Sequence, residues 1–169
     1  VKHKYPSQII NDKLFLGNMS NARNKQVLMN LQITHIVNVT TSSWQQMFDV
    51  DEDLKIKYLQ CPVEDDEETQ IITYFDTAID FIVNALKSDS NRVLVHCQAG
   101  VSRSSTIVIA YLMKVKKMSY ADAYKYTLDR REIIEPNEGF VEQLKLYEKH
   151  ALMASHEAVA SLCMDGLSK

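Results

Sequence analysis

The sequence predicts an α/β domain, with a central, twisted and mainly parallel sheet that is flanked by helices on both faces. Short β-rich runs alternate with segments whose apolar residues recur at helical spacing. One run, Arg92-Val93-Leu94-Val95-His96, is typical of a buried central strand of a parallel sheet. At 46% hydrophobic and 24% charged residues, the chain of 169 residues can bury one sizeable core.

The first third of the chain predicts short strands around one helix. The turn pair Asn11-Asp12 separates two apolar runs and therefore indicates a hairpin. A β-rich stretch further along indicates a buried strand. In chain order we expect a hairpin at 8–10 and 13–17, a surface helix within 18–30, a buried strand at 34–39, a variable loop at 41–53 and a strand at 55–59.

Helical periodicity dominates the remainder. Between Ile71 and Leu86 the apolar residues fall on one helical stripe, which predicts an amphipathic helix. Ser119 begins a pattern that resembles a capping box. In chain order we expect a helix at 71–86, a central strand at 92–96, a buried helix at 106–115, a helix opening at Ser119 and another opening at Pro136, with Phe140, Leu144 and Tyr147 inward. Residues 1–150 should form one domain and residues 151–169 a helical extension or a tail.

Composition narrows the classes of function. The 19 basic and 22 acidic residues give a net charge of -3, which provides no footprint for nucleic acid. No apolar run approaches the ~20 residues that span a bilayer. The cysteines Cys61, Cys97 and Cys163 are widely spaced and suit neither a disulfide framework nor a zinc site. We therefore expect a reducing compartment, the cytoplasm, with the nucleus as an alternative.

The loop that follows the central strand carries the candidate chemistry. Five residues separate Cys97 from Arg103, and a loop of this length can turn its N–H groups inward as an anion-binding nest. The next helix directs its positive N-terminus to the same point. Gly100 permits an unusual backbone conformation, and Arg103 can donate two hydrogen bonds to an oxyanion. This positive field favours the nucleophilic thiolate form of Cys97.

A cysteine–histidine protease dyad is disfavoured by the position of His96. Neighbouring side chains at the end of a strand point to opposite faces, so His96 should not reach Cys97 as a base. We expect His96 to orient the loop through backbone hydrogen bonds. The interpretation of His96 as a buried core histidine overlaps with this one and stays open.

The pattern His96-Cys97, five residues, then Arg103-Ser104 resembles the signature of the cysteine-based protein tyrosine phosphatase superfamily. The string from His96 to Ser104 resembles its dual-specificity branch, and the chain looks like the small, atypical members. The resemblance covers roughly residues 6–149 and identifies residues 1–150 as the catalytic domain. Its further matches are Leu14-Phe15-Leu16-Gly17, His35-Ile36-Val37-Asn38-Val39, Ala110-Tyr111-Leu112-Met113, Arg130-Arg131 and Pro136-Asn137-Glu138-Gly139-Phe140.

The resemblance implies a role for each residue of the site. Cys97 would attack phosphorus, Arg103 would hold the phosphate oxygens, and Ser104 would donate to the sulfur. His96 and Asn137 would support the loop. No metal and no other cofactor is expected, because the loop supplies the positive field. The residues of the phosphate-binding loop would be Gln98, Ala99, Gly100, Val101, Ser102 and Arg103.

The resemblance implies an acid that protonates the leaving oxygen, on a loop before the long amphipathic helix, where this chain has the acidic run at 64–68. In similar phosphatases the acid lies seven residues after a tyrosine that begins the preceding strand. Counting from Tyr58 gives Asp65, which stands 32 residues before Cys97. Asp66 is the alternative if the count is wrong by one residue. The other acids of the run are expected to be solvated charges.

The expected activity is the hydrolysis of phosphotyrosine, phosphoserine and phosphothreonine on proteins, with kinases of a signalling cascade as further partners. The uncharged loop residues Gln98, Ala99 and Val101 disfavour a phosphoinositide phosphatase or an RNA triphosphatase. A phosphoprotein-binding module without turnover is a further alternative. Cys61 is either a core residue or a resolving thiol for oxidised Cys97. The oligomeric state stays open.

Overall fold

The structure is a computed structural model that describes residues 3–42 and 53–165, with side chains to residue 151. Its centre is a five-stranded sheet with the strand order β1-β2-β5-β3-β4. The central position of β5 confirms the prediction for residues 92–96. The strands are β1 Ser7–Ile10, β2 Leu14–Gly17, β3 His35–Asn38, β4 Lys57–Gln60 and β5 Val93–His96.

Four of the strands run parallel, and their carboxyl ends are aligned. Gly17 at the end of β2 pairs with His96 at the end of β5, and His96 pairs in turn with Asn38 of β3. Asn38 pairs with Gln60 at the end of β4. β1 is antiparallel to β2, which confirms the predicted hairpin. The loops after β2, β4 and β5 therefore leave the sheet at one edge, where ligands of open α/β sheets bind.

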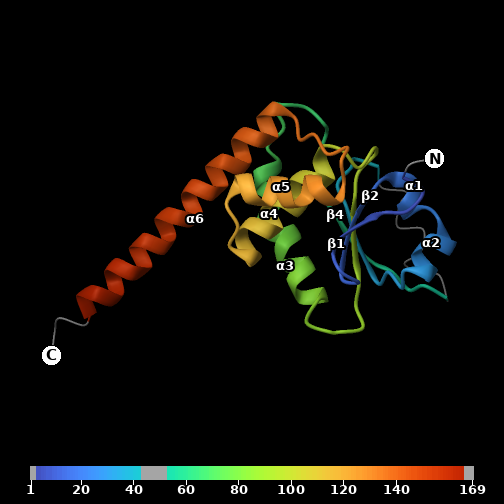
Figure 1. Ribbon diagram of the computed structural model, residues 1–169, viewed down its shortest axis with the longest axis horizontal. Coiled ribbons are helices and arrows are strands. Elements are labelled where there is room, and N and C mark those ends of the chain that lie inside the picture. The colour runs from blue at the N-terminus through green and yellow to red at the C-terminus, as the bar shows by residue number, and fades with distance from the viewer. Residues whose placement is uncertain (1–2, 43–52, 166–169) are drawn as a thin grey trace.

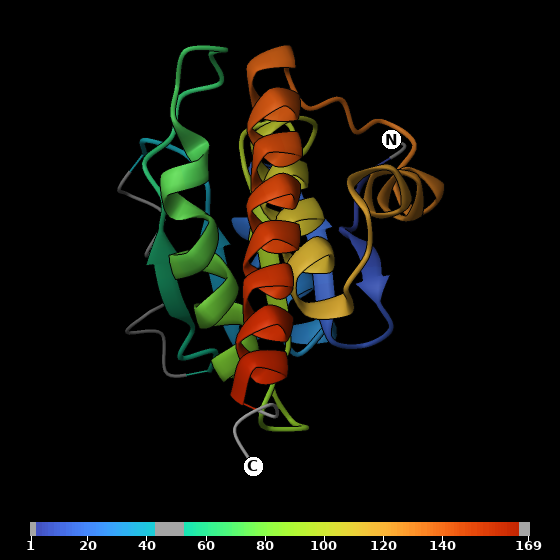
Figure 2. The same ribbon diagram turned by 90° about the vertical axis from the view of Figure 1, so that its left-hand side faces the viewer.

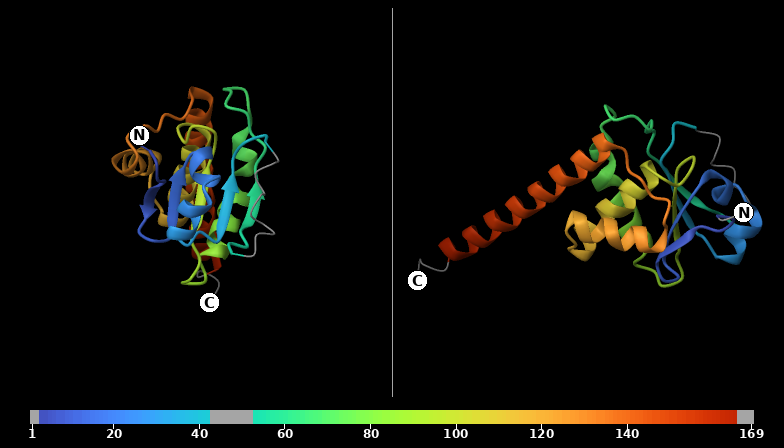
Figure 3. Two further views of the ribbon diagram at one scale, coloured as in Figure 1. Left: turned by 90° about the vertical axis from the view of Figure 1, so that its right-hand side faces the viewer. Right: turned by 45° about the horizontal axis from the view of Figure 1, so that its top comes forward.

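Helices cover both faces of the sheet, as predicted (Figure 1). The short α1 and α2 lie on one face, and α3, α4, α5 and α6 lie on the other, where Figure 2 shows α6 in front of α4 and between α3 and α5. Figure 3 shows the opposite side, with α1 and α2 in front of the sheet. The helices are α1 Met19–Ala22, α2 Lys25–Asn30, the 3₁₀ turn η1 Ile71–Tyr74, α3 Phe75–Ala85, α4 Arg103–Lys116, α5 Tyr120–Arg130 and α6 Glu138–Asp165.

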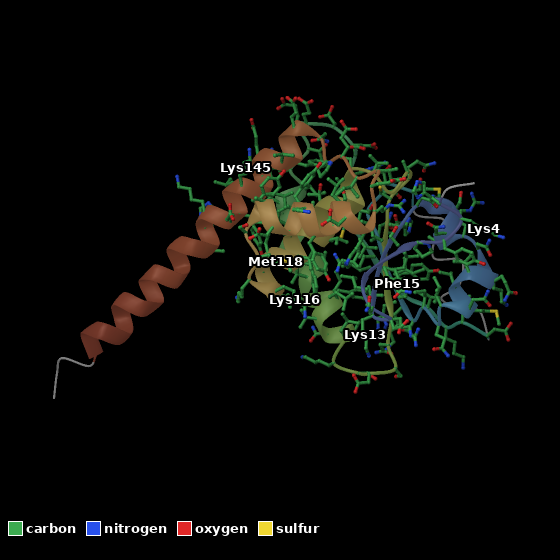
Figure 4. The ribbon with its side chains drawn as sticks, viewed as in Figure 1. Lys4, Lys13, Phe15, Lys116, Met118 and Lys145 are labelled. Atoms are coloured by element: carbon green, nitrogen blue, oxygen red, sulfur yellow. The ribbon has the colours of Figure 1, made fainter. Side chains whose placement is uncertain are left out.

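Strand alternation divides the apolar side chains between two cores. In β5, Val93 and Val95 join the larger core beneath α3 to α6, whereas Leu94 joins the smaller core beneath α2. Phe15 of β2 belongs to the smaller core and lies in the sheet in Figure 4. Phe140 at the start of α6 is fully buried in the larger core, as predicted. The larger core thereby fixes α4 against the sheet and α6 against α4.

The structure corrects several predicted boundaries. The single helix expected within 18–30 is two helices, because Asn24 has an extended backbone and caps a new helix by accepting from Val27 N. β4 begins at Lys57 rather than at Lys55, whose positive φ of 47° is incompatible with a strand. The expected loop at 41–53 lies mostly outside the described residues.

The last helix, α6, extends far beyond the body of the molecule (Figure 1). Its first turns pack against α4 and η1. Among the helices within the described residues, none is both long and apolar enough to cross a bilayer.

Candidate active site

The loop after β5 is held by hydrogen bonds from three other segments. Its carbonyls at Gln98 and Val101 accept from Met19 N and Glu135 N, at 3.2 and 2.9 Å. The carbonyl of Gly100 accepts from the Arg131 side chain. Because outside donors engage these carbonyls, the loop is fixed from the α1 side and from the segment that precedes α6.

Cys97 lies in this loop at the N-terminal end of α4, which has 14 residues. Its sulfur is 3.2 Å from Ser104 Oγ and accepts from Gly100 N at 3.3 Å. The residue is 1% exposed. An N–H donor, a hydroxyl group and the positive end of a helix thus surround the sulfur. Ser104 Oγ lies within hydrogen-bonding distance of the sulfur, and its predicted role as the donor stays a prediction.

Gly100 adopts a backbone conformation that other residues resist. Its φ is +68°, and a Cβ at this position would lie 2.5 Å from Gly17 O and 2.6 Å from Arg131 Nη2. Both the left-handed conformation and the close packing therefore require glycine. The same conformation directs Gly100 N to the Cys97 sulfur.

Arg103 begins α4 and reaches toward the segment before the acidic run. Its Nη1 donates to Val63 O at 3.0 Å, which orients the guanidinium. Its Nε is buried and has no partner among the described residues. This donor is available to an oxyanion bound in the loop.

His96 is fully buried and donates from Nδ1 to Cys97 O across 3.2 Å. Burial lowers the pKa of His96 to about 4, and the Arg103 charge acts in the same direction. The ring is therefore neutral near pH 7. Its contact is with the backbone of Cys97, and the described contacts of the sulfur do not include it. This geometry agrees with an orienting role and not with a protease dyad.

The acidic run at 64–68 follows β4 in the chain and lies beside the first turn of α6 (Figures 1 and 2). Asp65 is exposed, and its Oδ1 accepts from Asn137 Nδ2 at 3.0 Å. Asp66 turns to its own segment, where Oδ1 accepts from Glu68 N at 2.9 Å. The two candidate acids thus have different surroundings, and Asp65 is the one tied to the rest of the site.

Asn137 joins three parts of the site. Its backbone N donates to Ser102 Oγ in the Cys97 loop at 3.1 Å. Its side-chain oxygen caps α6 by accepting from Phe140 N at 2.9 Å, while its side-chain nitrogen holds Asp65. The predicted supporting residue therefore links the nucleophile loop, the acid loop and the last helix.

Sequence reasoning did not assign Arg131 to the site. This residue follows α5, is 1% exposed, and donates from Nε to Gly100 O at 2.8 Å. Its position in the pair Arg130-Arg131 was the only signal in the sequence, and that pair does not indicate which arginine turns inward.

Cys61 follows β4 and is fully buried in the larger core. Burial raises the pKa of its thiol to about 12, so it stays protonated at neutral pH. A protonated, buried thiol is a poor nucleophile toward an oxidised cysteine. These properties favour the core residue over the resolving thiol.

A mainly parallel sheet, a cysteine at the N-terminal end of a buried helix and an arginine six residues later form the architecture of the cysteine-based phosphatases. The model of the family described as dual specificity phosphatase, catalytic domain, matches residues 14–150. The chain therefore belongs to the dual specificity phosphatase family.

Relatives by sequence carry the same description. The chain is 45% identical over 146 residues to a probable rhodanese domain-containing dual specificity protein phosphatase of Dictyostelium discoideum, a match that covers 86% of this chain and 29% of the relative. It is 41% identical over 131 residues to human dual specificity protein phosphatase 26, covering 78% and 62%. The chain thus spans less than two thirds of the length of these curated relatives.

Solved structures share the fold. A human tyrosine phosphatase-like serine/threonine/tyrosine-interacting protein is 34% identical, with a TM-score of 0.76 and coverage of 89% of this chain and 99% of that one. A mouse putative dual specificity phosphatase complexed with zinc tungstate is 28% identical, with a TM-score of 0.79 and coverage of 89% and 90%.

Proposed function

We propose that this protein hydrolyses phosphate monoesters on tyrosine, serine and threonine side chains of proteins through a cysteinyl-phosphate intermediate. One observation carries the proposal. The Cys97 sulfur lies between Ser104 Oγ and Gly100 N at the start of α4. Arg103, at the end of the same loop, donates a hydrogen bond to Val63 O, two residues before Asp65.

In the first step, the Cys97 thiolate attacks phosphorus. The sulfur–phosphorus bond forms and the bond from phosphorus to the substrate oxygen breaks. Arg103 and the loop N–H groups bind the other three oxygens, which carry the developing charge. Asp65 gives its proton to the departing oxygen.

In the second step, water attacks the phosphorus of the cysteinyl-phosphate and passes a proton to Asp65. The sulfur–phosphorus bond breaks, inorganic phosphate leaves, and the Cys97 thiolate is restored. The Ser104 hydroxyl donates to the sulfur as its charge returns. Asp65 ends protonated and ready for the next cycle.

Protein substrates are supported by the names of the relatives and by the loop itself. Gln98 and Ala99 are exposed and uncharged, so the loop offers no extra cations for a polyphosphorylated ligand. Substrates phosphorylated by kinases of a signalling cascade, in the cytoplasm or the nucleus, suit this site. The second candidate is a phosphoprotein-binding module, which the similarity to the human phosphatase-like interacting protein favours.

Turnover of p-nitrophenyl phosphate and of phosphotyrosine and phosphothreonine peptides tests the proposal. The wild type should turn over all three, and Cys97→Ser should abolish turnover while it still binds the peptides. Arg103→Lys should lose at least ~100-fold, as when one oxyanion donor is removed. Turnover by Cys97→Ser within tenfold of the wild type would exclude Cys97 as the nucleophile. A wild type that binds peptides without turnover would establish the binding module.

A further inference from the structure

Arg131 is the largest of the fully buried side chains in the described part of the chain. Buried arginines are rare unless a carboxylate pairs with them. Here the guanidinium donates to a carbonyl, Gly100 O at 2.8 Å, and to a hydroxyl, Ser7 Oγ at 3.2 Å. Its Nη2 has no partner, and no carboxylate contacts it among the described residues. The charge is therefore buried without an ion pair.

This guanidinium lies directly against the residue that contacts the nucleophile. A Cβ on Gly100 would be 2.6 Å from Arg131 Nη2. Gly100 accepts from Arg131 through its carbonyl and donates through its N–H to the Cys97 sulfur. One residue thus separates the buried cation from the sulfur.

The electrostatic relationship follows from this arrangement. Burial lowers the pKa of Arg131, and a negative charge on Cys97 opposes that shift. Attraction between two charges is mutual. If a negative charge on Cys97 stabilises the Arg131 cation, the Arg131 cation stabilises that negative charge equally. Arg103, the cation within the loop, donates to a different segment, at Val63 O.

We infer that Arg131 is a positioning residue for the reaction. It fixes the Gly100 carbonyl so that the Gly100 N–H faces the Cys97 sulfur, and its unpaired charge stabilises the thiolate from behind the loop. The catalytic consequence rests on the proposed function. A purely structural role does not account for the charge, because an apolar side chain of similar volume is usually cheaper to bury than an ion.

Three variants separate these roles. Arg131→Met removes the charge and the donors, Arg131→Lys keeps the charge, and Arg130→Met is the matched control. Arg130 is exposed and stacks on Tyr126 at 3.4 Å from the ring centre, away from the Cys97 loop. For each variant, the melting temperature, the rate of Cys97 alkylation by iodoacetamide near pH 6, and kcat and KM for p-nitrophenyl phosphate are measured.

In folded Arg131→Met, iodoacetamide should alkylate Cys97 at least about tenfold more slowly than in the wild type. The kcat of this variant should fall by a similar factor. Arg131→Lys should recover part of the alkylation rate, and Arg130→Met should match the wild type. Alkylation and kcat of Arg131→Met within twofold of the wild type would overturn the inference, as would failure of both Arg131 variants to fold. Alkylation needs no substrate, so it remains decisive even if the wild type fails to turn over phosphate esters.

Discussion

Asn137 holds the carboxylate of Asp65 through its side-chain amide, with 3.0 Å between Nδ2 and Oδ1, although 72 residues separate them in the chain. This bond distinguishes Asp65 from the other acids of the run at 64–68. Asp66, its closest competitor, caps its own turn through Glu68 N. The position of the proposed general acid thus depends on a residue in another element of the fold.

Replacement of Asp65 by asparagine should lower turnover of phosphotyrosine peptides by about 10²-fold or more, the usual contribution of a general acid. The basic limb of the pH–rate profile should flatten. The loss should be smaller for p-nitrophenyl phosphate, because its leaving oxygen needs less help from a proton. Asp66→Asn is the matched control and should change turnover little, since the amide oxygen can still accept from Glu68 N. If Asp66→Asn loses the basic limb and Asp65→Asn keeps it, Asp66 is the acid.

Asn137→Asp should lower turnover by about tenfold at little cost in stability. The new carboxylate can still accept from Phe140 N and cap α6, but it cannot donate to Asp65 and repels it. Asn137→Ala loses the cap as well and should cost about 1 kcal/mol of unfolding free energy. Urea unfolding and peptide kinetics measure the two effects. Normal turnover in Asn137→Asp would show that Asp65 needs no such anchor.

Gly139→Ala should displace the acid loop. A Cβ at Gly139 would overlap the backbone carbonyl of Glu67, two residues beyond Asp65. Overpacking of this kind costs about 1–3 kcal/mol, although alanine favours the helix. We expect peptide turnover to fall, with a smaller effect on p-nitrophenyl phosphate. Glu138→Ala, at the exposed neighbouring position, is the control. Equal kinetics in the two variants would mean that the acid loop can shift without a loss of peptide turnover.

Protonation of His96 should destabilise the protein in mild acid. Its folded pKa of about 4 lies below the ordinary value near 6.5, so the unfolded chain binds this proton more readily. The stabilisation is complete above pH ~6.5 and is lost as the pH falls toward 4, by up to about 3 kcal/mol. His35, whose pKa burial also lowers, contributes in the same direction. His96→Asn keeps an amide donor for Cys97 O and should show a shallower pH dependence in urea unfolding; identical slopes would contradict the assignment.

Much of the fold could be predicted because local patterns determine it. The short β-branched run at 92–96 and the apolar stripe from Ile71 were confirmed, since each side-chain pattern matches one burial geometry. The break of the helix at Asn24 depends on a side-chain cap that competes with helix continuation, which periodicity does not reveal.

The site likewise has features that local sequence predicts and features that only tertiary contacts determine. Cys97, Gly100 and Ser104 lie within eight residues, so their spacing predicted a shared loop. Asp65 was proposed by counting along a resembling pattern, and its bond to Asn137 could not be predicted because it joins two loops that are distant in the sequence. The inward turn of Arg131 depends on tertiary packing against Gly100, and no local signal encodes it.

The bonds of Asn137 also set an order on assembly. Its partners, Ser102 and Asp65, precede it by 35 and 72 residues, so these contacts close only after α6 has docked. Both contacts need the start of α6, which Asn137 caps, in addition to the sheet that carries the Cys97 loop. The sheet and the Cys97 loop can be present in a refolding intermediate whose acid is still unanchored. Recovery of turnover during refolding should therefore lag behind recovery of the sheet signal, so that activity would report the completion of folding.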